Sequence, residues 1–440
     1  MNASLRLGPR SRFPGETLLY FQRDPAGYLE ELASAYGDVV RFRLGPMDTF
    51  LFNHPDLIKQ VLVTQNRNFR LGYAHQRVRH FFGDGLVTSE GDTHLRQRRH
   101  IEPLFHHRHI TQSADTAVDF TARWCDERRV GETLDLGHEM WALTLNIIAK
   151  TLFNASVKSE IQEISKAVYD TTSLFSPLMM LAADWLIRLR LPPSQQFARA
   201  RARLDKTMYR IIQEHRARGD QGDLLSMMLR ASETDSEMNN VQLRDQVLTF
   251  FVAGHGTTAL ALTWTFYLLS QNPEAEAQLY DEMERVLADR LPTLADLQNL
   301  SYARNVLKEA MRMYPPVWGM DREVIKECEI GGHTLPKGAL VLLCQWVTHH
   351  DARFFPDPYR FEPERWADAE PCPKYAYFPF SVGPRVCVGE EMTWMNGVLL
   401  LTTIAQRWRM RLQPGQHIIP SAGTSLAPKN GVWMDLERRI

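Results

Sequence analysis

Apolar and basic residues alternate in a short stretch near the start of the chain, over residues 39–44. A Gly45-Pro46 pair follows, and residues 49–52 are again mostly apolar. Alternation with a period of two is typical of a half-buried strand, and glycine and proline mark turns. The pattern predicts a β-hairpin with its turn at residues 45–48, and a helix that begins near residues 53–55.

The middle of the chain has a helical period, because apolar residues recur every three or four positions from about residue 114 to 287. Helix-breaking residues divide this region at four places: residues 154–156, 191–193, 218–220 and 271–273. A last helix is predicted over about residues 390–408. Most of the fold should therefore be α-helical.

Strand-like residues return at 329–347, around a Gly331-Gly332 turn. The following stretch, residues 354–380, is rich in proline and aromatic residues and has little period. No internal repeat, low-complexity tract or linker divides the sequence. We therefore expect one large, mainly α (α+β) domain over residues 1–440, with no second domain fused to it.

The composition agrees with a large globular protein. The chain has 440 residues, 44% of them hydrophobic, which is enough to bury a sizeable core. Its 51 basic and 52 acidic residues nearly cancel, so no global charge attracts nucleic acid or an anionic membrane. Disordered and fibrous classes are excluded, and partner sites must be sought locally.

Five widely spaced cysteines include no C-x-x-C pair: Cys125, Cys328, Cys344, Cys372 and Cys387. An odd number without paired spacing favours a reducing compartment. The N-terminal residues lack the continuous apolar stretch of a signal peptide, and no run approaches the roughly 20 residues that span a bilayer. We expect a cytoplasmic protein with no transmembrane anchor.

The most specific chemical pattern is segment 380–389. Gly383 and Gly389 permit a turn or a close approach that a Cβ would obstruct. Cys387 stands just before the predicted last helix, whose N-terminal amides favour a thiolate. A thiolate can ligate iron, and Arg385 can pair with a haem propionate. A lone cysteine is more often structural, so the assignment depends on the whole segment.

Segment 380–389 resembles the haem-binding loop of the cytochrome P450 family, F-x-x-G-x-R-x-C-x-G, at every fixed position. The resemblance implies that Cys387 is the axial ligand of haem b. As an axial ligand, a thiolate pushes electron density toward iron and favours cleavage of the dioxygen bond. Other residues of the loop that would contact the cofactor are Phe380, Gly383, Arg385 and Gly389.

A second pattern is formed by Glu309 and Arg312, which lie on one helical face at i,i+3. Taken alone, such pairs are mostly exposed and weak. Together with segment 361–366, however, they resemble the family's E-x-x-R helix and P-E-R-F segment, with Trp366 in place of the final Phe. The resemblance implies that Glu309, Arg312 and Arg365 form a buried structural triad behind the haem loop.

A third pattern, residues 250–259, interrupts a helical period with two glycines, although glycine costs up to about 1 kcal/mol in a helix interior. From Ala253 onward it resembles the family's oxygen-groove motif, A-G-x-[D/E]-T-[T/S], whose small residues let the haem face approach. The resemblance assigns Thr257 and Thr258 to the oxygen pocket. Gly256 replaces the usual acid of the proton-delivery pair, so waters, Thr257 or a peroxide shunt would have to substitute.

A fourth pattern lies in residues 91–99, where His94 and Arg98 are one helical turn apart and can both donate to an anion. It resembles the family's propionate-binding helix, and a plain basic helix is the alternative. The resemblance gives four candidates for binding the haem carboxylates: His94, Arg98, Arg322 and Arg385.

Arg96, Arg99 and His100 can instead face outward. They would then form a basic patch for an acidic ferredoxin or flavodoxin that receives electrons from an NAD(P)H reductase. A solvated charged face is the alternative at these positions.

A rival interpretation comes from residues 254–259, which fit the dinucleotide fingerprint G-x-G-x-x-[G/A] after a strand-like run at 247–252. It predicts an NAD(P)-binding dehydrogenase. This alternative requires strands and helices to alternate around the glycines, and it leaves Cys387 unexplained.

Over nearly the whole chain, the resemblance implies a cytochrome P450 fold with a large helical domain, a small β-rich region and a buried haem. It implies a monomeric haem-thiolate monooxygenase that inserts one oxygen atom of O2 into a terpenoid, steroid, fatty acid or similar apolar substrate. A peroxide-driven peroxygenase, favoured by Gly256, and a haem gas sensor are the other classes. The candidate substrate residues are Leu86, Val87, Phe250, Val317, Trp318, Thr424 and Ser425.

Overall fold

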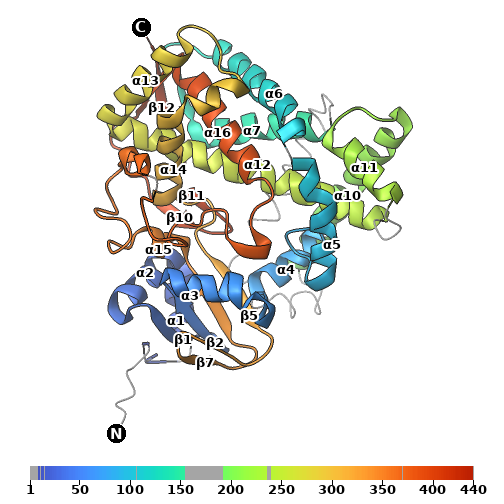
Figure 1. The fold of residues 1–440 in the computed structure, drawn as a ribbon, viewed down its shortest axis with the longest axis vertical. Helices are drawn as coiled ribbons and strands as arrows, with labels where there is room; N and C mark the ends of the chain where they lie inside the picture. Colours follow the sequence, from blue (N-terminus) through green and yellow to red (C-terminus); the bar gives the residue numbers. More distant parts are fainter. Residues whose placement is uncertain are drawn as a thin grey trace.

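A computed structural model of the chain describes residues 8–439 except 10, 14, 106, 154–191, 235–238 and 369. Figure 1 shows a strand-rich part at the end where the N-terminus lies, and a larger helical part at the end where the C-terminus lies. The elements follow one another as the sequence pattern predicts in most places. The fold is mainly helical, with several small sheets.

The hairpin predicted from alternating residues is confirmed. Strand β1 (Val39–Leu44) pairs antiparallel with β2 (Met47–Phe52). The second strand begins at Met47, two residues earlier than predicted, because Gly45 takes a positive φ of 61° and the turn needs only two residues. Helices α1 (Glu16–Arg23) and α2 (Pro25–Tyr36) precede this hairpin.

Five strands form the main sheet in the order β1-β2-β8-β5-β3. Strand β8 (Leu340–Leu343) runs parallel to β2 and antiparallel to β5 (Met320–Val324), which also pairs with β3 (Phe69–Leu71). This order places Arg322 of β5 opposite Leu71 of β3, although the two residues are far apart in sequence. Helix α3 (Pro55–Lys59) and the π-helical turn Gln60–Thr64 lie between β2 and β3.

The predicted strand region 329–347 is correct in its first part and wrong in its last. Strands β6 (Cys328–Ile330) and β7 (His333–Leu335) form a hairpin around the two expected glycines. The chain leaves the sheet after β8 and forms helix α15 (Gln345–His349). A short apolar run does not distinguish a buried strand from a buried helical turn, which explains the error.

The helical part contains the long helices of the chain. The predicted breaks at 218–220 and 271–273 are confirmed, 191–193 coincides with the start of α10, and 154–156 lies outside the described residues. The α-helices not yet introduced are α4 (Tyr73–Phe82), α5 (Gly91–Ile101), α6 (His107–Asp126), α7 (Leu136–Phe153), α10 (Pro192–Arg218), α11 (Leu224–Thr234), α12 (Asn240–Gln271), α13 (Pro273–Leu287), α14 (Ser301–Met313) and α16 (Glu390–Ala405). Short 3-10 segments lie at Asn66–Asn68, Glu102–Phe105, Leu294–Gln298, Pro363–Ala367 and Gly383–Arg385.

A three-stranded sheet joins distant parts of the chain in the order β4-β12-β9. Its strands are β4 (Thr133–Asp135), β12 (Trp433–Arg438) and β9 (Trp408–Leu412). The last predicted helix therefore ends at Ala405, three residues early, because Trp408 already pairs with Arg438. A further hairpin consists of β10 (Pro420–Ala422) and β11 (Leu426–Pro428).

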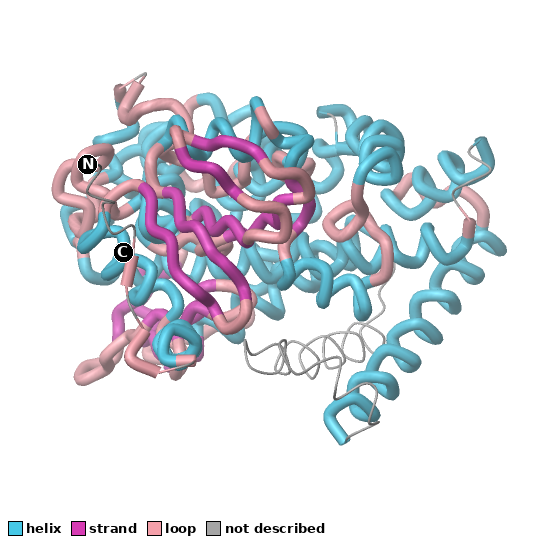
Figure 2. Tube along the Cα trace, turned by 90° about the horizontal axis from the view of Figure 1, so that it is seen from below, coloured by secondary structure: helices cyan, strands magenta, loops and turns pink. Residues whose placement is uncertain are grey.

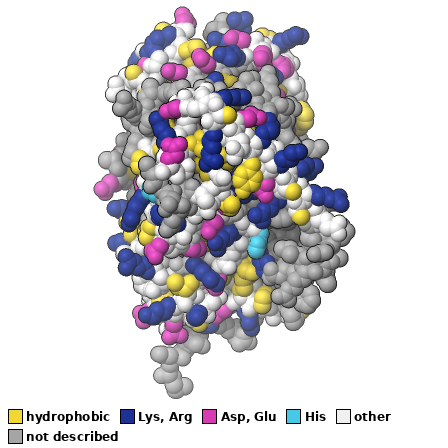
Figure 3. All heavy atoms as spheres, turned by 90° about the vertical axis from the view of Figure 1, so that its right-hand side faces the viewer, with side chains coloured by type: hydrophobic (Ala, Val, Ile, Leu, Met, Phe, Trp, Pro, Cys, Tyr) yellow, Lys and Arg dark blue, Asp and Glu magenta, His cyan; other side chains and the backbone are white. Residues whose placement is uncertain are grey.

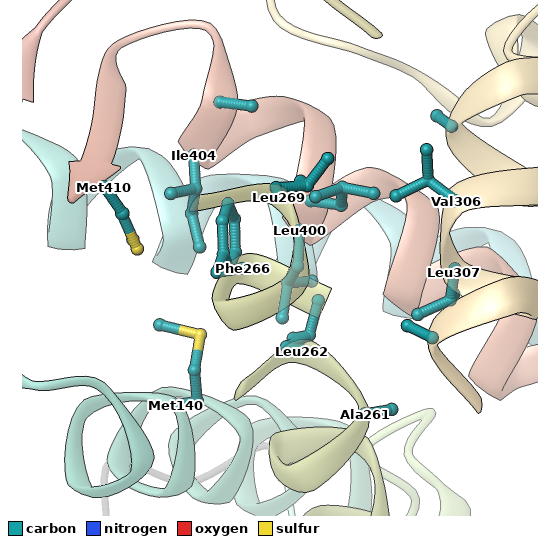
Figure 4. Close-up of a cluster of buried hydrophobic side chains, with 14 of the residues drawn as sticks. Met140, Ala261, Leu262, Phe266, Leu269, Val306, Leu307, Leu400, Ile404 and Met410 are labelled. Carbon is teal, nitrogen blue, oxygen red and sulfur yellow. The ribbon is translucent and has the colours of Figure 1, made fainter. Parts of the chain in front are cut away.

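The largest hydrophobic cluster fixes α12 against its neighbours. Met140 of α7, Phe266 of α12, Leu307 of α14, Ile404 of α16 and Met410 of β9 all belong to it (Figure 4). Because α16 follows Cys387 directly, this core sets the position of the cysteine loop relative to α12.

Helix α12 corrects two expectations. With 32 residues it is long and apolar enough to cross a membrane, but 67% of its most apolar window is buried in the protein, as in a core helix. Figure 2 shows that most of the molecule is helical and that the main strands lie together. Residues 247–252, read as a strand in the dehydrogenase alternative, lie inside α12, so the glycines that follow do not form a strand-to-helix turn.

Candidate active site

Cys387 lies in a tight loop that ends where α16 begins. Its backbone N–H donates to the Phe380 carbonyl oxygen at 3.0 Å, and the Phe380 ring packs edge-on against Trp394 of α16. Gly383 has a φ of 76°, and a Cβ there would lie 2.3 Å from the Leu62 carbonyl oxygen. Only glycine fits this position without a shift of the backbone. The close contact at Gly383 and the hydrogen bond of Cys387 together fix the backbone of the loop.

The Cys387 thiol is accessible and also has many protein atoms around it. The residue is exposed, yet burial among surrounding atoms raises the pKa of its thiol, while the Gly389 amide N–H lowers it to a smaller extent. The helix N-terminus alone therefore does not stabilise a thiolate, contrary to the sequence expectation. Because a metal cation would supply the missing stabilisation, the thiol fits an iron ligand. A Cβ at Gly389 would lie 3.8 Å from this sulfur.

Four side chains predicted to bind the haem carboxylates gather beside this loop: His94, Arg98, Arg322 and Arg385. Arg98 of α5 donates from Nη1 to the Val386 carbonyl oxygen at 2.7 Å. Arg385 donates from Nη2 to a Glu90 carboxylate oxygen at 3.0 Å. The guanidinium of Arg322 donates to its neighbouring Asp321 carbonyl oxygen at 2.8 Å.

The electrostatics of this cluster indicate an anion site. His94 and Arg322 are only 5% and 8% exposed. Burial, followed by the charges of Arg385 and Arg98, lowers the pKa of His94 to about 4. Burial, followed by Arg385, lowers the pKa of Arg322 to about 10. These shifts mark a positive potential in a poorly solvated place, which the two carboxylates of a haem would offset.

The middle of α12 is exposed although most of the helix is buried. Ala253 and Gly254 are exposed, and the Thr257 hydroxyl donates to the Ala253 carbonyl oxygen at 3.0 Å. Thr258 donates to the Gly254 carbonyl oxygen at 3.2 Å and is itself buried. Ala253 and Thr257, one turn apart, therefore share the exposed side of the helix, where the Thr257 hydroxyl can still accept a hydrogen bond.

The two glycines of this segment approach α7. A Cβ at Gly254 would lie 2.9 Å from Ile148 Cδ1, and a Cβ at Gly256 would lie 3.1 Å from Trp141 Cζ3. His255 is fully buried and packs edge-on against Trp141, with ring centroids 4.5 Å apart. The missing Cβ atoms thus allow close packing of α7 and α12, and position 256 points at a tryptophan ring.

The structure brings the predicted triad together. Arg312 donates from Nε and Nη2 to the two carboxylate oxygens of Glu309, each at 2.9 Å, and both side chains are fully buried. Arg365 Nε lies 3.4 Å from Glu309 Oε1. Arg312 also donates from Nη1 to the His349 carbonyl oxygen at 2.8 Å. The triad therefore ties α14 to the segments before the haem loop.

Two contributors were missed from the sequence. The Trp366 indole N–H donates to Glu309 Oε2 at 2.9 Å, so the residue that departs from the family pattern adds a donor to the triad. Glu90 accepts from the Leu71 backbone N–H at 2.6 Å and from Arg385. The available signal for Glu90 was an acidic residue at the predicted start of a helix.

The candidate substrate residues divide into three groups. Leu86 and Phe250 are buried in one hydrophobic cluster, whereas Val87 is 45% exposed. Trp318 donates from Nε1 to the Gly423 carbonyl oxygen at 2.8 Å. This bond brings the segment of Val317 and Trp318 to the β10–β11 turn that carries the other two candidates, exposed Thr424 and half-buried Ser425.

The fold and the Cys387 loop agree with a haem-thiolate protein. The family model described as Cytochrome P450 matches residues 9–433. The chain belongs to the cytochrome P450 family and is a cytochrome P450 monooxygenase, an oxidoreductase with a haem-thiolate cofactor.

Three curated relatives span nearly the same length. The chain is 37% identical to cyclooctat-9-en-7-ol 5-monooxygenase of Streptomyces melanosporofaciens, over 91% of this chain and 88% of that protein. It is 37% identical to cyclooctatin synthase of the same organism, over 93% and 90% of the two chains. It is 31% identical to pentalenene oxygenase of Streptomyces avermitilis, over 91% and 90%.

Proposed function

We propose that the chain uses haem b to insert one oxygen atom of O2 into a ring-containing terpenoid. The observation that carries the cofactor assignment is Cys387, an exposed thiol in the loop that carries Arg385 and that Arg98 contacts at the Val386 carbonyl oxygen. The substrate class is supported by relatives named for cyclooctat-9-en-7-ol and pentalenene. An exposed Val87 and the neighbouring apolar cluster of Leu86 and Phe250 suit an apolar substrate.

The residues of the chain have separate roles in this proposal. When bound, haem supplies the oxygen-activating chemistry. Cys387 would hold its iron, and four hydrogen-bond donors would hold its carboxylates: His94, Arg98, Arg322 and Arg385. The Thr257 hydroxyl would accept and pass on protons at its Oγ1, which stays on the exposed side of α12 through its bond to the Ala253 carbonyl.

A direct test compares electron donors and substrates. With a ferredoxin, its reductase, NADPH and pentalenene, we expect a monooxygenated product that carries one oxygen atom from 18O-labelled O2. Lauric acid, an acyclic fatty acid, should give at most weak turnover. Turnover of pentalenene with peroxide alone, but not with the electron donors, would favour a peroxygenase, which Gly256 allows. No turnover under either condition would contradict the proposal and favour a sensor.

Restoring an acid at position 256 tests the proton supply. Because a Cβ at Gly256 would approach the Trp141 ring to 3.1 Å, the acid is introduced with Trp141→Phe to provide room. Gly256→Glu in this background should raise the fraction of electrons that end in product several-fold, since general acid catalysis is worth about 10²- to 10⁴-fold. Gly256→Gln, of equal size but unable to donate a carboxyl proton, should not. Equal coupling in both variants would contradict the expectation.

We further propose a cytoplasmic, monomeric, single-domain protein that receives electrons from a separate ferredoxin or flavodoxin. Helices α5 and α10 lie on the same side of the molecule, where Figure 3 shows Lys and Arg side chains among Asp and Glu. On α5, Arg99 is exposed and Arg96 half-buried, and Leu95 beside them is 44% exposed. An apolar residue among cations suits docking of an acidic partner.

Charge reversal on α5 tests this docking site. Arg96→Glu with Arg99→Glu should slow reduction of the iron by about tenfold or more at low salt, because steering changes association rates by about 10- to 10³-fold. Substrate binding should not change. The matched control is Arg216→Glu with Lys429→Glu, which has the same charge change at two exposed cations on other elements. If the iron is reduced at the same rate in both double variants, a docking site on α5 is excluded.

A further inference from the structure

The loop of residues 83–90, between α4 and α5, is held by consecutive residues of α12. The Asp84 backbone N–H donates to Asp245 Oδ2 at 2.7 Å. The Leu86 backbone N–H donates to Gln246 Oε1 at 3.0 Å. Arg244 Nη1 donates to the carbonyl oxygen of Phe82, the last residue of α4, at 3.2 Å. Three neighbouring side chains of one helix thus bind the backbone of the loop.

At two glycines, the loop approaches α12 so closely that there is no room for a side chain. A Cβ at Gly83 would lie 2.2 Å from the Asp245 carboxyl group, and a Cβ at Gly85 would lie 2.1 Å from Thr249 Oγ1. Gln246 is fully buried, and Thr249 is 5% exposed. The contact is therefore a dry, close-packed joint, and it transmits the position of α12 to the loop.

Val87 is the exposed residue of this loop. It is 45% exposed, although Leu86 and Thr88 on either side are 6% and 2% exposed. Gln246 lies about three turns before Thr257 in α12, and Thr249 lies about two turns before it. These residues share one side of the helix with Ala253, because positions 246, 249, 253 and 257 recur at helical spacing. The loop packs against the part of this side that contains Gln246 and Thr249. The exposed part of the same side begins at Ala253. Val87, one of the candidate substrate residues, directly follows Leu86, the residue whose backbone Gln246 holds.

Gln246 uses only one half of its amide in this joint. Its Oε1 accepts from Leu86, whereas its Nε2 is buried and has no hydrogen-bond partner among the residues that the structure describes. An unsatisfied buried donor costs stability, so a purely structural role is better served by another residue. The acceptor oxygen is what Gln246 contributes to the joint.

We propose that Gln246 is a positioning residue that fixes Val87 and thereby determines which carbon of the substrate is oxidised. The inference rests on the proposed monooxygenase function. A substrate with few polar groups is oriented mainly by the shape of its apolar walls, so a small displacement of one wall residue changes which carbon lies nearest the iron. Gln246 itself touches the loop backbone and not the substrate.

The test is the ratio of oxidation products from one terpene, pentalenene, together with haem content and thermal midpoint. Gln246→Leu removes the acceptor and should change the product ratio by about fivefold or more, because a misplacement of about 1 Å can change a rate by about 10²-fold. Gln246→Glu keeps an acceptor oxygen at the same reach and should restore the original ratio. Thr263→Val is the matched control, because it removes a buried hydrogen bond of α12, to Ala259, that does not reach the loop.

A second variant moves the loop without changing α12. Gly85→Ala places a Cβ against Thr249 and should shift the product ratio in the same direction as Gln246→Leu, even if the latter folds poorly. If Val87→Ala changes the ratio but Gln246→Leu and Gly85→Ala do not, the positioning role is excluded. If the unaltered protein oxidises no terpene at all, the proposed function is wrong. This result differs from an unchanged product ratio in the variants, which would exclude only the positioning role of Gln246.

Discussion

Cys387→Ser is expected to abolish the strongly red-shifted Soret band of the reduced protein under carbon monoxide. Serine preserves the loop, because the bond to the Phe380 carbonyl oxygen comes from the backbone N–H. It removes the sulfur, however, and an alcohol does not supply the electron density of a thiolate to iron. The change is one of ligand chemistry and should be complete, with loss of monooxygenase turnover.

The control for this experiment is Cys328→Ser. Cys328 is a half-buried free thiol in β6, and its replacement should leave both the spectrum and the turnover unchanged. A red-shifted band that persists in Cys387→Ser would mean that another residue ligates the iron. An ordinary imidazole-type band in the unaltered protein would overturn the assignment altogether.

Arg312→Ala is expected to yield protein that does not retain haem and that is destabilised by about 3–5 kcal/mol, because it leaves a buried carboxylate without its main partner. Glu309 would keep the more distant Arg365, at 3.4 Å, the Trp366 indole and the Glu362 backbone N–H, at 3.2 Å. The substitution also frees the His349 carbonyl oxygen, which Arg312 now bonds at 2.8 Å. Urea denaturation and the haem-to-protein ratio measure the two effects.

Arg304→Ala provides the comparison on the same helix. Arg304 is exposed on α14 and lies over the Trp394 ring at 5.7 Å. Its loss should cost less than about 1 kcal/mol, as is usual for exposed charged residues. If Arg312→Ala keeps full haem occupancy and unfolds at the same urea concentration as Arg304→Ala, the triad has no role in holding the haem loop.

Local sequence patterns predicted the parts of the fold that depend on local chemistry. The hairpin of β1 and β2 and the helix breaks near 218 and 271 follow from alternation, glycine and proline. The cysteine loop was recognisable because several fixed residues stand close together in sequence. Residues that meet across long separations, such as Glu309 and Arg365, were accessible only through the family resemblance.

Other features depend on directions and surroundings that a sequence does not contain. The sequence places Gly256 in the oxygen-groove motif, and the backbone direction adds that a Cβ at this position would approach Trp141. The thiol pKa of Cys387 was expected to fall, but burial outweighs the amide of Gly389. Gln246 was missed because its partner is a backbone N–H, which leaves no mark in the sequence.

The three-stranded sheet has a consequence for the order of events on the ribosome. Strand β12 lies between β4 and β9 and pairs with both, but it is synthesised after both of them. During translation β4 is therefore exposed until most of the chain has emerged, and this corner of the molecule closes only at the end. A nascent chain stalled before Trp433 should remain sensitive to protease near residue 133, whereas one stalled well beyond β12 should be protected there.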